Sequence, residues 1–317
     1  MRSRVLNFEE YPWIWAFFGS LILWAAIGIA SSNFSVESLI TNASIASFLA
    51  IISLGQMFAI SLGEGSIDLS IPYVITLSAF LSMGIIDGKN SNILMGLLVA
   101  LGIGLLVGII NTMSITILRI PPIIATMALG FILNTAIFIY AAKFKAFSSA
   151  PLLANISKGS IFGIPWMFVI SIIVAGFIWF IISQTSYGRA LMATGQNKTA
   201  ANLVGINVNR TILGAYLLSG TLAALGGVLI AARVGGAFLD MGQPYLLQSV
   251  GVVVIGGTLV SGGKATVIGT VFGALFMILL ATLMTVTRLP IGVQNIIEGV
   301  LIILILAVAT PKAMDRI

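Results

Sequence analysis

The sequence contains no cysteine and no histidine among its 317 residues. These two absences exclude disulfide frameworks, thiol nucleophiles, histidine bases and zinc sites built from Cys and His ligands. Charge is also scarce, since charged residues make up only 8% of the chain, against about 25% in ordinary globular proteins. So few charges do not cover the surface of a water-soluble particle of this length, and a soluble enzyme is therefore excluded.

Long apolar segments take the place of the missing charge. Hydrophobic residues make up 59% of the chain, and 34 glycines add to them. A spanning helix needs about 20 mostly apolar residues, because the hydrocarbon layer is about 30 Å thick and a helix rises about 1.5 Å per residue. Ten segments qualify, near residues 13–30, 44–62, 67–87, 92–117, 122–142, 163–183, 210–232, 246–260, 266–287 and 293–309.

These runs are continuous rather than alternating, which favours helices over a β-barrel. We therefore predict an all-α integral membrane protein with about ten transmembrane helices, in one transmembrane domain over residues 1–317. The eighth segment is short enough to be broken or re-entrant. The first is expected to be an uncleaved span, because it is longer than a signal-peptide core and follows Glu9 and Glu10.

The net charge of +6 is better explained by loops that orient the spans than by a nucleic-acid surface. Ten spans place both termini in the cytoplasm and give an inner side that is richer in basic residues, as the positive-inside rule requires. The inner set is Arg2, Arg4, Arg119, Arg189, Lys198, Arg210, Lys264, Lys312 and Arg316, and the outer set is Lys89, Lys143, Lys145, Lys158, Arg233 and Arg288.

The longest connection runs from Gln184 to Asn209 on the predicted inner side. A short helix is expected over residues 187–192, ending at Gly195 as a left-handed cap, and a second from Asn197 to Gly205. Such a pair suits the docking of a soluble partner, and a merely interfacial amphipathic loop is the alternative. The predicted outer segment 143–163 is expected to be an irregular cap.

Small residues recur every four positions in two of the predicted spans, where we expect tight helix packing and no ligand role. They are Ala100, Gly104, Gly108 and Thr112 in the fourth span, and Gly269 and Gly273 in the ninth.

Acidic residues at membrane depth are few, which argues against a carboxylate relay of the kind an ion-coupled carrier needs. Asp68 is expected either to cap the start of the third span or to act in transport. Glu298 in the tenth span needs a partner, and a hydrogen-bonded packing role is favoured. Glu64 and Arg233 are expected at the membrane interfaces.

Neutral polar side chains are better represented in the predicted spans. Amides and hydroxyls hydrogen-bond a neutral polyhydroxylated solute without burying net charge, although each one taken singly is more often a contact between helices. The residues that we assign to a substrate path are Gln56, Asp68, Ser70, Tyr73, Asn134, Gln248 and Asn295; Asn111 and Gln294 are further polar residues in the spans.

No phosphate-binding loop and no dinucleotide fingerprint occurs in the sequence. We assign no catalytic, cofactor or metal residues to this chain. If transport is driven uphill, the energy is expected to enter through another polypeptide.

Several segments together resemble the permease subunits of bacterial ABC importers for monosaccharides such as ribose, galactose and xylose. Four motifs carry the resemblance: residues 188–206, Ile67-Asp68-Leu69-Ser70, Arg119-Ile120-Pro121, and Val254-Ile255-Gly256-Gly257-Thr258 followed by Ser261-Gly262-Gly263 and Gly269-Thr270. One departure is that the family usually has Gly-Gly before the Ile-Asp-Leu-Ser motif and Val-Gly after it. Here Gly63-Glu64-Gly65-Ser66 precedes the motif and Ile71-Pro72 follows it, so the chain departs from the family's pattern at this turn.

The resemblance implies half of a pore that pairs with a second permease, identical or paralogous. It also implies an ABC ATPase that holds ATP and Mg²⁺, and a periplasmic or lipid-anchored solute-binding protein. The ATPase is expected on the coupling segment 184–209, at the positions that match the family's motif: Gly188, Arg189, Ala193, Gly195, Asn197, Ala200, Ala201 and Gly205. The expected location is the bacterial inner membrane.

Two other transport functions stay open at this point. One is a related permease for branched-chain amino acids or nucleosides, and the other is an ion-coupled secondary carrier. An intramembrane enzyme is disfavoured, because no Asp/Glu pair or Ser/Lys dyad stands at helical spacing in a predicted span.

Overall fold

The computed structural model describes residues 13–143 and 148–309 of the chain. Residues Arg2, Arg4, Lys145, Lys312 and Arg316 of the predicted topology, and both chain termini, lie outside the described residues. The helices are α1 (Trp13–Ala30), α2 (Val36–Ser61), α3 (Ile71–Ile86), α4 (Ile93–Thr116), α5 (Pro122–Lys143), α6 (Pro151–Lys158), α7 (Trp166–Gln184), α8 (Ser186–Gln196), α9 (Lys198–Leu203), α10 (Val208–Val234), α11 (Tyr245–Ile255), α12 (Val267–Val286) and α13 (Ile291–Ala309). A 3₁₀ turn η1 (Asn90–Asn92) and a hairpin of β1 (Ser160–Ile161) and β2 (Ile164–Pro165) complete the described elements.

Ten of these helices follow the ten predicted apolar segments in order. Seven of them, α1, α2, α4, α5, α7, α10 and α12, are long and apolar enough to cross a membrane. The helices α3 and α11, and the described part of α13, are shorter. The total number of membrane crossings therefore stays a prediction.

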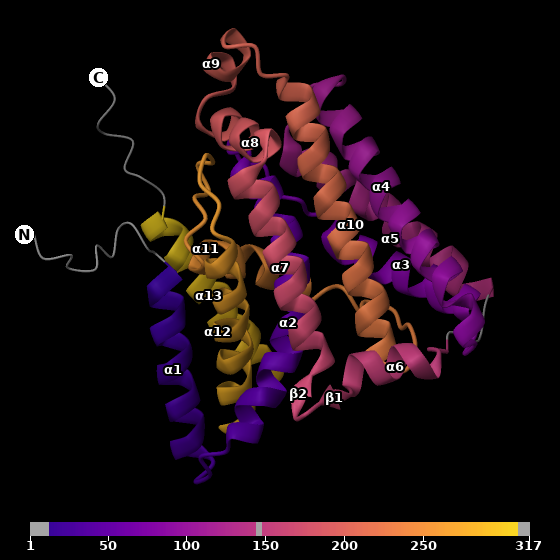
Figure 1. Ribbon diagram of the computed structural model, residues 1–317, viewed down its shortest axis with the longest axis vertical. Helices are drawn as coiled ribbons and strands as arrows, with labels where there is room; N and C mark the ends of the chain where they lie inside the picture. Colours follow the sequence, from indigo (N-terminus) through magenta and orange to yellow (C-terminus); the bar gives the residue numbers. More distant parts are fainter. Residues whose placement is uncertain (1–12, 144–147, 310–317) are drawn as a thin grey trace, which may run out of the picture.

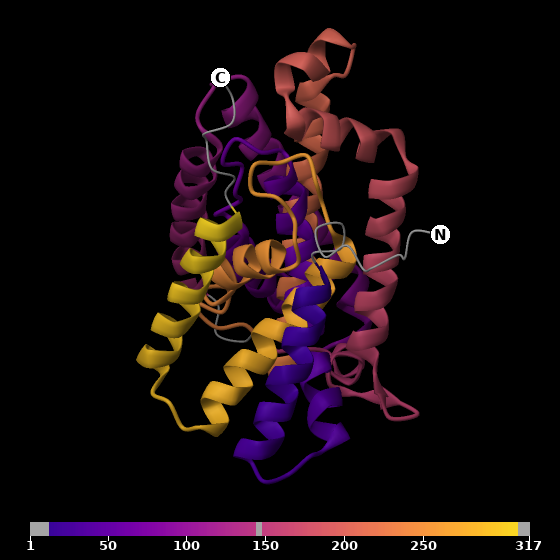
Figure 2. The same cartoon turned by 90° about the vertical axis from the view of Figure 1, so that its left-hand side faces the viewer.

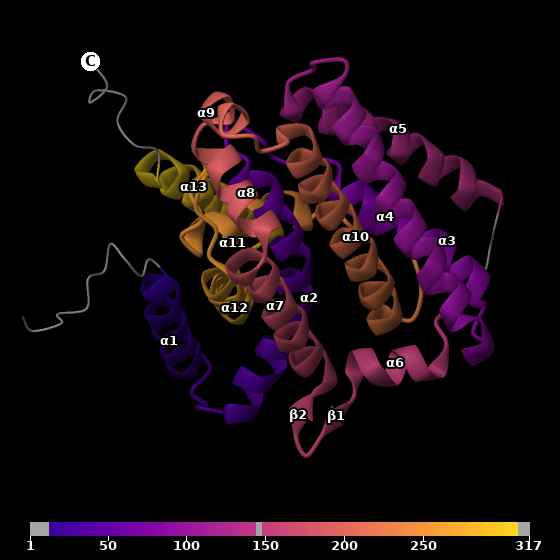
Figure 3. The same cartoon turned by 45° about the horizontal axis from the view of Figure 1, so that its top comes forward.

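The central pair of the bundle is α2 and α10, which are the two most buried of the long helices. Figure 3 shows α3, α4 and α5 on one side of this pair and α1, α11, α12 and α13 on the other. On the first of these sides, α4 lies directly against α10. A Cβ atom added to Gly104 would lie 2.5 Å from the Gly220 carbonyl oxygen, and one added to Gly108 would lie 2.6 Å from that of Tyr216.

Glycines also bring α12 against α11. A Cβ atom on Gly269 or on Gly273 would collide with backbone atoms of Gly256 or Val252. The predicted packing role of the small-residue stripes is confirmed by these contacts, since only glycine permits backbones to approach so closely.

Two predicted spans are clearly shorter in the structure than in the prediction. The third was expected over residues 67–87, but α3 begins at Ile71, with Pro72 in its first turn, where the missing N–H needs no partner. The eighth was expected over residues 246–260, but α11 ends at Ile255, because Gly256 is followed by Gly257 in a left-handed conformation. Both helices are preceded by loops that contain buried residues, among them Asp68 and Met241.

The end of the bundle that carries α6 and the hairpin is shown at the bottom of Figure 1. The segment 143–163 was predicted as irregular, and this is wrong for its second half. Pro151 starts the eight-residue helix α6, whose buried Leu153 and Ser157 face the bundle. Arg233 at the end of α10 fixes α6, because its guanidinium donates to the Ser157 carbonyl at 3.0 Å and to the Ser44 hydroxyl at 3.3 Å.

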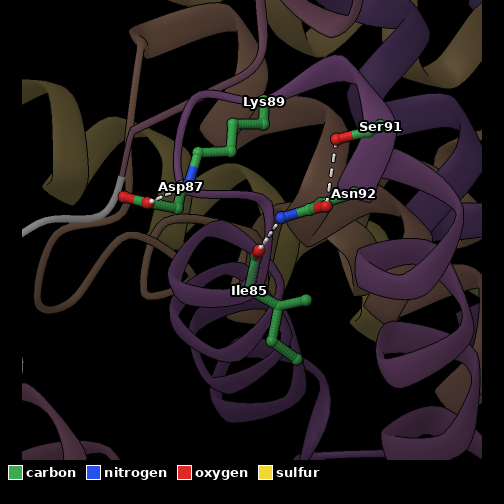
Figure 4. A network of polar contacts seen from close by, with 5 residues as sticks. All are labelled: Ile85, Asp87, Lys89, Ser91 and Asn92. Atoms are coloured by element: carbon green, nitrogen blue, oxygen red, sulfur yellow. Dashed lines mark hydrogen bonds and ion pairs between the residues drawn. The ribbon is translucent and has the colours of Figure 1, made fainter.

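The turn from α3 to α4 lies at this same end. The Asn92 amide donates to the Ile85 carbonyl oxygen at 3.1 Å, and an exposed ion pair joins Lys89 to Asp87 at 3.3 Å (Figure 4). The side chains of this turn therefore hold α3 and α4 in a hairpin.

The helices α8 and α9 lie at the opposite end, and α9 projects farthest beyond the bundle (Figures 1 and 2). The first described helix, α1, runs away from this end, and the last, α13, runs toward it (Figure 2). These directions agree with an even number of helices crossing the bundle.

Candidate functional site

The coupling segment 184–209 folds into α8 and α9, each with a side-chain cap at its start. The Thr185 hydroxyl accepts a hydrogen bond from the Gly188 amide at 3.2 Å, and the Asn197 side chain accepts one from the Ala200 amide at 2.9 Å. The predicted cap at Asn197 is confirmed. Gly205, with φ of 85°, follows the second helix as predicted.

The predicted role of Gly195 as a left-handed helix cap is wrong. Gly195 is a buried residue within α8, and α8 continues to Gln196. A Cβ atom at this position would collide with the Ser61 carbonyl oxygen and the Gly263 amide nitrogen. Glycine is therefore required here by space and not by backbone conformation.

Three of the residues predicted to contact an ATPase are buried inside this chain. Gly188 packs against the end of α7, Gly195 packs against Ser61 and Gly263, and Ala201 is the buried residue of α9. These positions shape the coupling segment and do not present a side chain to a partner. Arg189, Asn197, Ala200 and Gly205 are exposed, and Ala193 is half-buried.

The most exposed apolar side chains of this end were missed by the sequence reasoning. Leu203 and Val204 are 82% and 77% exposed at the tip of α9. A groove of about 590 Å³ lies beside them and is lined by residues of α9 and the start of α10, from Lys198 to Asn209. The signal that would have found this surface is an adjacent apolar pair at the end of the second short helix, between the polar residue Asn202 and Gly205.

Tyr187 connects α8 to α10. Its hydroxyl donates to the Thr211 carbonyl at 3.3 Å, and its ring packs over Gly214, where no side chain intervenes. Burial raises the pKa of the Tyr187 hydroxyl, because the charged form is disfavoured in this apolar contact. The first turn of α8 is therefore fixed to the bundle.

Asp68 lies in the loop between α2 and α3 and is only 2% exposed. One of its carboxyl oxygens accepts hydrogen bonds from the amide and the hydroxyl of Ser70, and the other accepts from the Ser219 hydroxyl at 2.7 Å. Asn111 of α4 donates to the Ser70 hydroxyl at 3.1 Å. Asp68 does not cap α3 directly, since it stands two residues before the N-cap position Ser70. Instead it joins the loop to α4 and α10.

The remaining residues of the predicted path divide by burial. Gln56 is buried in α2, and no described group hydrogen-bonds its Oε1 atom. Tyr73, Asn134 and Gln248 are half-buried on α3, α5 and α11, and Asn295 is exposed on α13. Tyr73, Asn134 and Asn295 stand on three different helices, α3, α5 and α13.

Glu298 has the partner that its depth requires. The Gln248 amide donates to both carboxyl oxygens of Glu298, at 3.4 and 3.2 Å. The predicted hydrogen-bonded packing role of Glu298 is therefore confirmed, and the bond joins α11 to α13.

A short internal repeat was also missed by the sequence reasoning. The run from Ile67 to Tyr73 and the run from Leu239 to Tyr245 share Asp, Pro and Tyr at the same spacing, with apolar residues at the first and third positions of both. Each run leads from a loop after a long helix into a short helix, α3 in one case and α11 in the other. The preceding long helices α2 and α10 run in opposite directions (Figure 1). The two halves of the bundle thus have inverted orientations, an arrangement common in transporters.

Comparisons with known proteins agree with this architecture. The family model described as "Branched-chain amino acid transport system / permease component" matches residues 38–306. The chain is 31% identical to a ribose import permease protein of Haemophilus influenzae over 87% of both chains, and 30% identical to that of Escherichia coli over 92% of both. It is 31% identical to a galactose/methyl galactoside import permease protein of Escherichia coli, over 68% of this chain and 66% of the relative. No solved structure matches the chain significantly.

Proposed function

This chain belongs to the family of branched-chain amino acid transport system permease components, and from that membership we propose that it is the permease subunit of an ATP-driven importer for a monosaccharide. It is a transport component and not an enzyme, and a multi-pass protein of the bacterial inner membrane. Its similarity to permeases named for ribose and galactose, over most of its length, is the observation that carries the proposal.

The polar groups of the bundle are suited to binding a neutral, hydroxyl-rich solute. Tyr73, Asn134 and Gln248 offer a phenol and two amides on half-buried positions of three different helices. Such groups replace the hydrogen bonds of a sugar to water without requiring a compensating charge in the membrane. A zwitterionic amino acid would call for buried charged partners. Glu298 on α13 already accepts hydrogen bonds from the Gln248 amide.

The α8–α9 pair supports docking of an ABC ATPase at the cytoplasmic end. Leu203 and Val204 form an exposed apolar tip, and the adjacent groove between α9 and α10 gives a partner a shaped surface around it. Apolar side chains surrounded by polar residues are typical of interface centres. ATP and Mg²⁺ would be held by that ATPase and not by this chain.

A second permease, identical or paralogous, would complete the pore beside the half-buried polar groups. A solute-binding protein would deliver the sugar at the α6 end, which lies opposite to α8 and α9. Closure of the ATPases would push α8 and α9 and rock the two permeases between outward-facing and inward-facing states.

Reconstitution tests the proposal directly. The chain, its cognate ATPase and its solute-binding protein are placed in proteoliposomes, and uptake of labelled ribose, galactose and leucine is measured with and without ATP. We expect ATP-dependent uptake of a sugar. Uptake by the chain alone, driven by an ion gradient, would contradict the proposal in favour of a secondary carrier. Uptake of leucine alone would favour the related amino-acid permeases, which the family description names.

The docking surface has its own test. Leu203→Asp should weaken co-purification of the ATPase by about 2 kcal/mol or more, the loss typical of a central interface residue. Phe162→Asp is the matched control, because Phe162 is 99% exposed at the hairpin tip on the opposite end. Equal co-purification of the ATPase with both variants would exclude α9 as the docking site.

A further inference from the structure

Four glycines bring three separate segments of the chain into backbone contact beneath α8. They are Gly195 in α8, Gly63 in the loop after α2, and Gly262 and Gly263 in the loop between α11 and α12, and we call them the glycine joint. The Gly263 amide donates to the Ser61 carbonyl at 3.0 Å. A Cβ atom on Gly262 would lie 2.6 Å from both the Gly195 carbonyl oxygen and the Gly63 Cα atom.

Gly195 differs from the other three glycines in its backbone conformation. Gly63, Gly262 and Gly263 have φ values of 70°, 87° and 77°, so any side chain there would strain the backbone. Gly195 is helical, and a side chain there would only separate α8 from the two loops. Alanine at Gly195 is therefore a probe of the contact itself.

The joint connects α8 to the two short helices of the bundle. The loop that contains Gly63 continues through Asp68 into the start of α3, and the loop that contains Gly262 continues from the end of α11. The two short helices also meet each other inside the bundle. The Gly242 amide, before α11, donates to the Thr76 hydroxyl of α3 at 3.0 Å.

The attachments of α8 differ at its two ends. Its first turn is held by Tyr187 on α10 and by the contact of Gly188 with the end of α7. Its last turn contacts neither of these helices through Tyr187 or Gly188 and packs against the glycine joint. A tilt of α8 about its first turn would therefore displace the joint.

We propose that the glycine joint transfers movement of the α8–α9 pair to α3 and α11, and so shifts Tyr73 and Gln248 in the solute path. This rests on the proposed docking of an ATPase on α9. Rigid backbone contact suits such a transfer, because no flexible side chain lies between the moving parts to absorb the displacement.

The first experiment uses Gly195→Ala in the assembled transporter with its ATPase and solute-binding protein. We expect normal co-purification of the ATPase and retained ATP hydrolysis, but sugar uptake lowered by about 5- to 150-fold, the range of typical coupling energies between sites. Gly176→Ala in α7 is the control, because a Cβ atom there meets nothing within 4 Å. Full uptake by the Gly195→Ala transporter overturns the proposal. Leu203→Asp in a chain that keeps Gly195 is measured separately, and loss of the ATPase from that variant reports on docking and not on the joint.

A second experiment does not depend on an alanine at the joint. Glu64 and Lys198 form an ion pair of 2.7 Å across the edge of the joint, and the chain has no native cysteine. Cysteines at both positions are bridged with a short bis-maleimide in the assembled transporter. If the joint moves as one body, bridging leaves uptake unchanged relative to the singly labelled variants. If α9 and the loop separate during transport, bridging abolishes uptake, and the proposal is wrong.

Discussion

The carboxyl group of Asp68 accepts a hydrogen bond from the hydroxyl of Ser219, with 2.7 Å between the two oxygens and 151 positions between the residues. Asp68 stands in the loop between α2 and α3, and Ser219 stands within the central helix α10. Ser70 supplies two further donors to the same carboxyl group. Because Asp68 is almost completely buried, this network replaces the water that the carboxyl group loses on folding.

Asp68→Ala should therefore destabilise the protein and lower uptake. The substitution leaves the buried hydroxyls of Ser70 and Ser219 without their acceptor, at a cost of about 1–3 kcal/mol. Ser219→Ala should cost less, because Asp68 keeps both bonds from Ser70. Denaturation in detergent micelles, followed by circular dichroism, measures both variants. Equal stability of Asp68→Ala and wild type would show that the network does not hold the loop.

The sequence was sufficient to predict the class of fold. Continuous apolar runs give the ten apolar helices in order, and the family comparisons confirm an all-α membrane permease. The limits of the helices were predicted less well. α2 begins at Val36, eight residues before its predicted start, because Ser35 accepts a hydrogen bond from the Ser38 amide and caps a polar first turn. Hydropathy alone does not register such a cap.

The parts that the sequence did not predict depend on contacts between distant segments. A glycine at position 195 is typical of a helix C-cap in the sequence. Only its contact with Ser61 and Gly263 in the structure shows why a side chain is excluded there. The motif around Asp68 was recognised, but its bond to Ser219 depends on how α10 packs against the loop. Which residues touch the solute stays a prediction.

Gly104→Ala should destabilise the contact between α4 and α10. An added methyl group would be pressed against the Gly220 carbonyl, and overpacking of this kind costs about 1–3 kcal/mol. Gly102→Ala, two residues away on the same helix, meets nothing within 4 Å and should be neutral or slightly stabilising. Thermal aggregation midpoints of the two purified variants give the comparison. A Gly104→Ala protein as stable as Gly102→Ala would show that the helices can separate at no cost.

The ion pair between Lys198 and Glu64 should contribute little to the free energy of unfolding. Its contribution should depend on the two residues having opposite charges. The pair is partly exposed, with Glu64 68% exposed, and such pairs contribute about 0.2–1 kcal/mol. Lys198→Glu should place two like charges together, and the double exchange with Glu64→Lys should restore most of the loss at low salt. The Lys89–Asp87 pair, at the opposite end, is the control (Figure 4). A double-mutant cycle on the free energy of unfolding that gives zero coupling between Lys198 and Glu64 would show that the ion pair does not stabilise the protein.

Glu298 distinguishes an ATP-driven permease from an ion-coupled carrier. Its carboxyl oxygens accept from the Gln248 amide, and Glu298→Gln keeps an acceptor for that bond while it removes the titratable group. ATP-dependent sugar uptake should therefore survive Glu298→Gln with at most a small loss. Glu298→Leu removes the acceptor and should lower uptake further, because the half-buried Gln248 amide is left without its partner. Initial uptake rates in the reconstituted system provide the measurement. If Glu298→Gln abolishes uptake as completely as Glu298→Leu does, the carboxylate itself takes part in transport, as a proton-coupled or sodium-coupled mechanism would require.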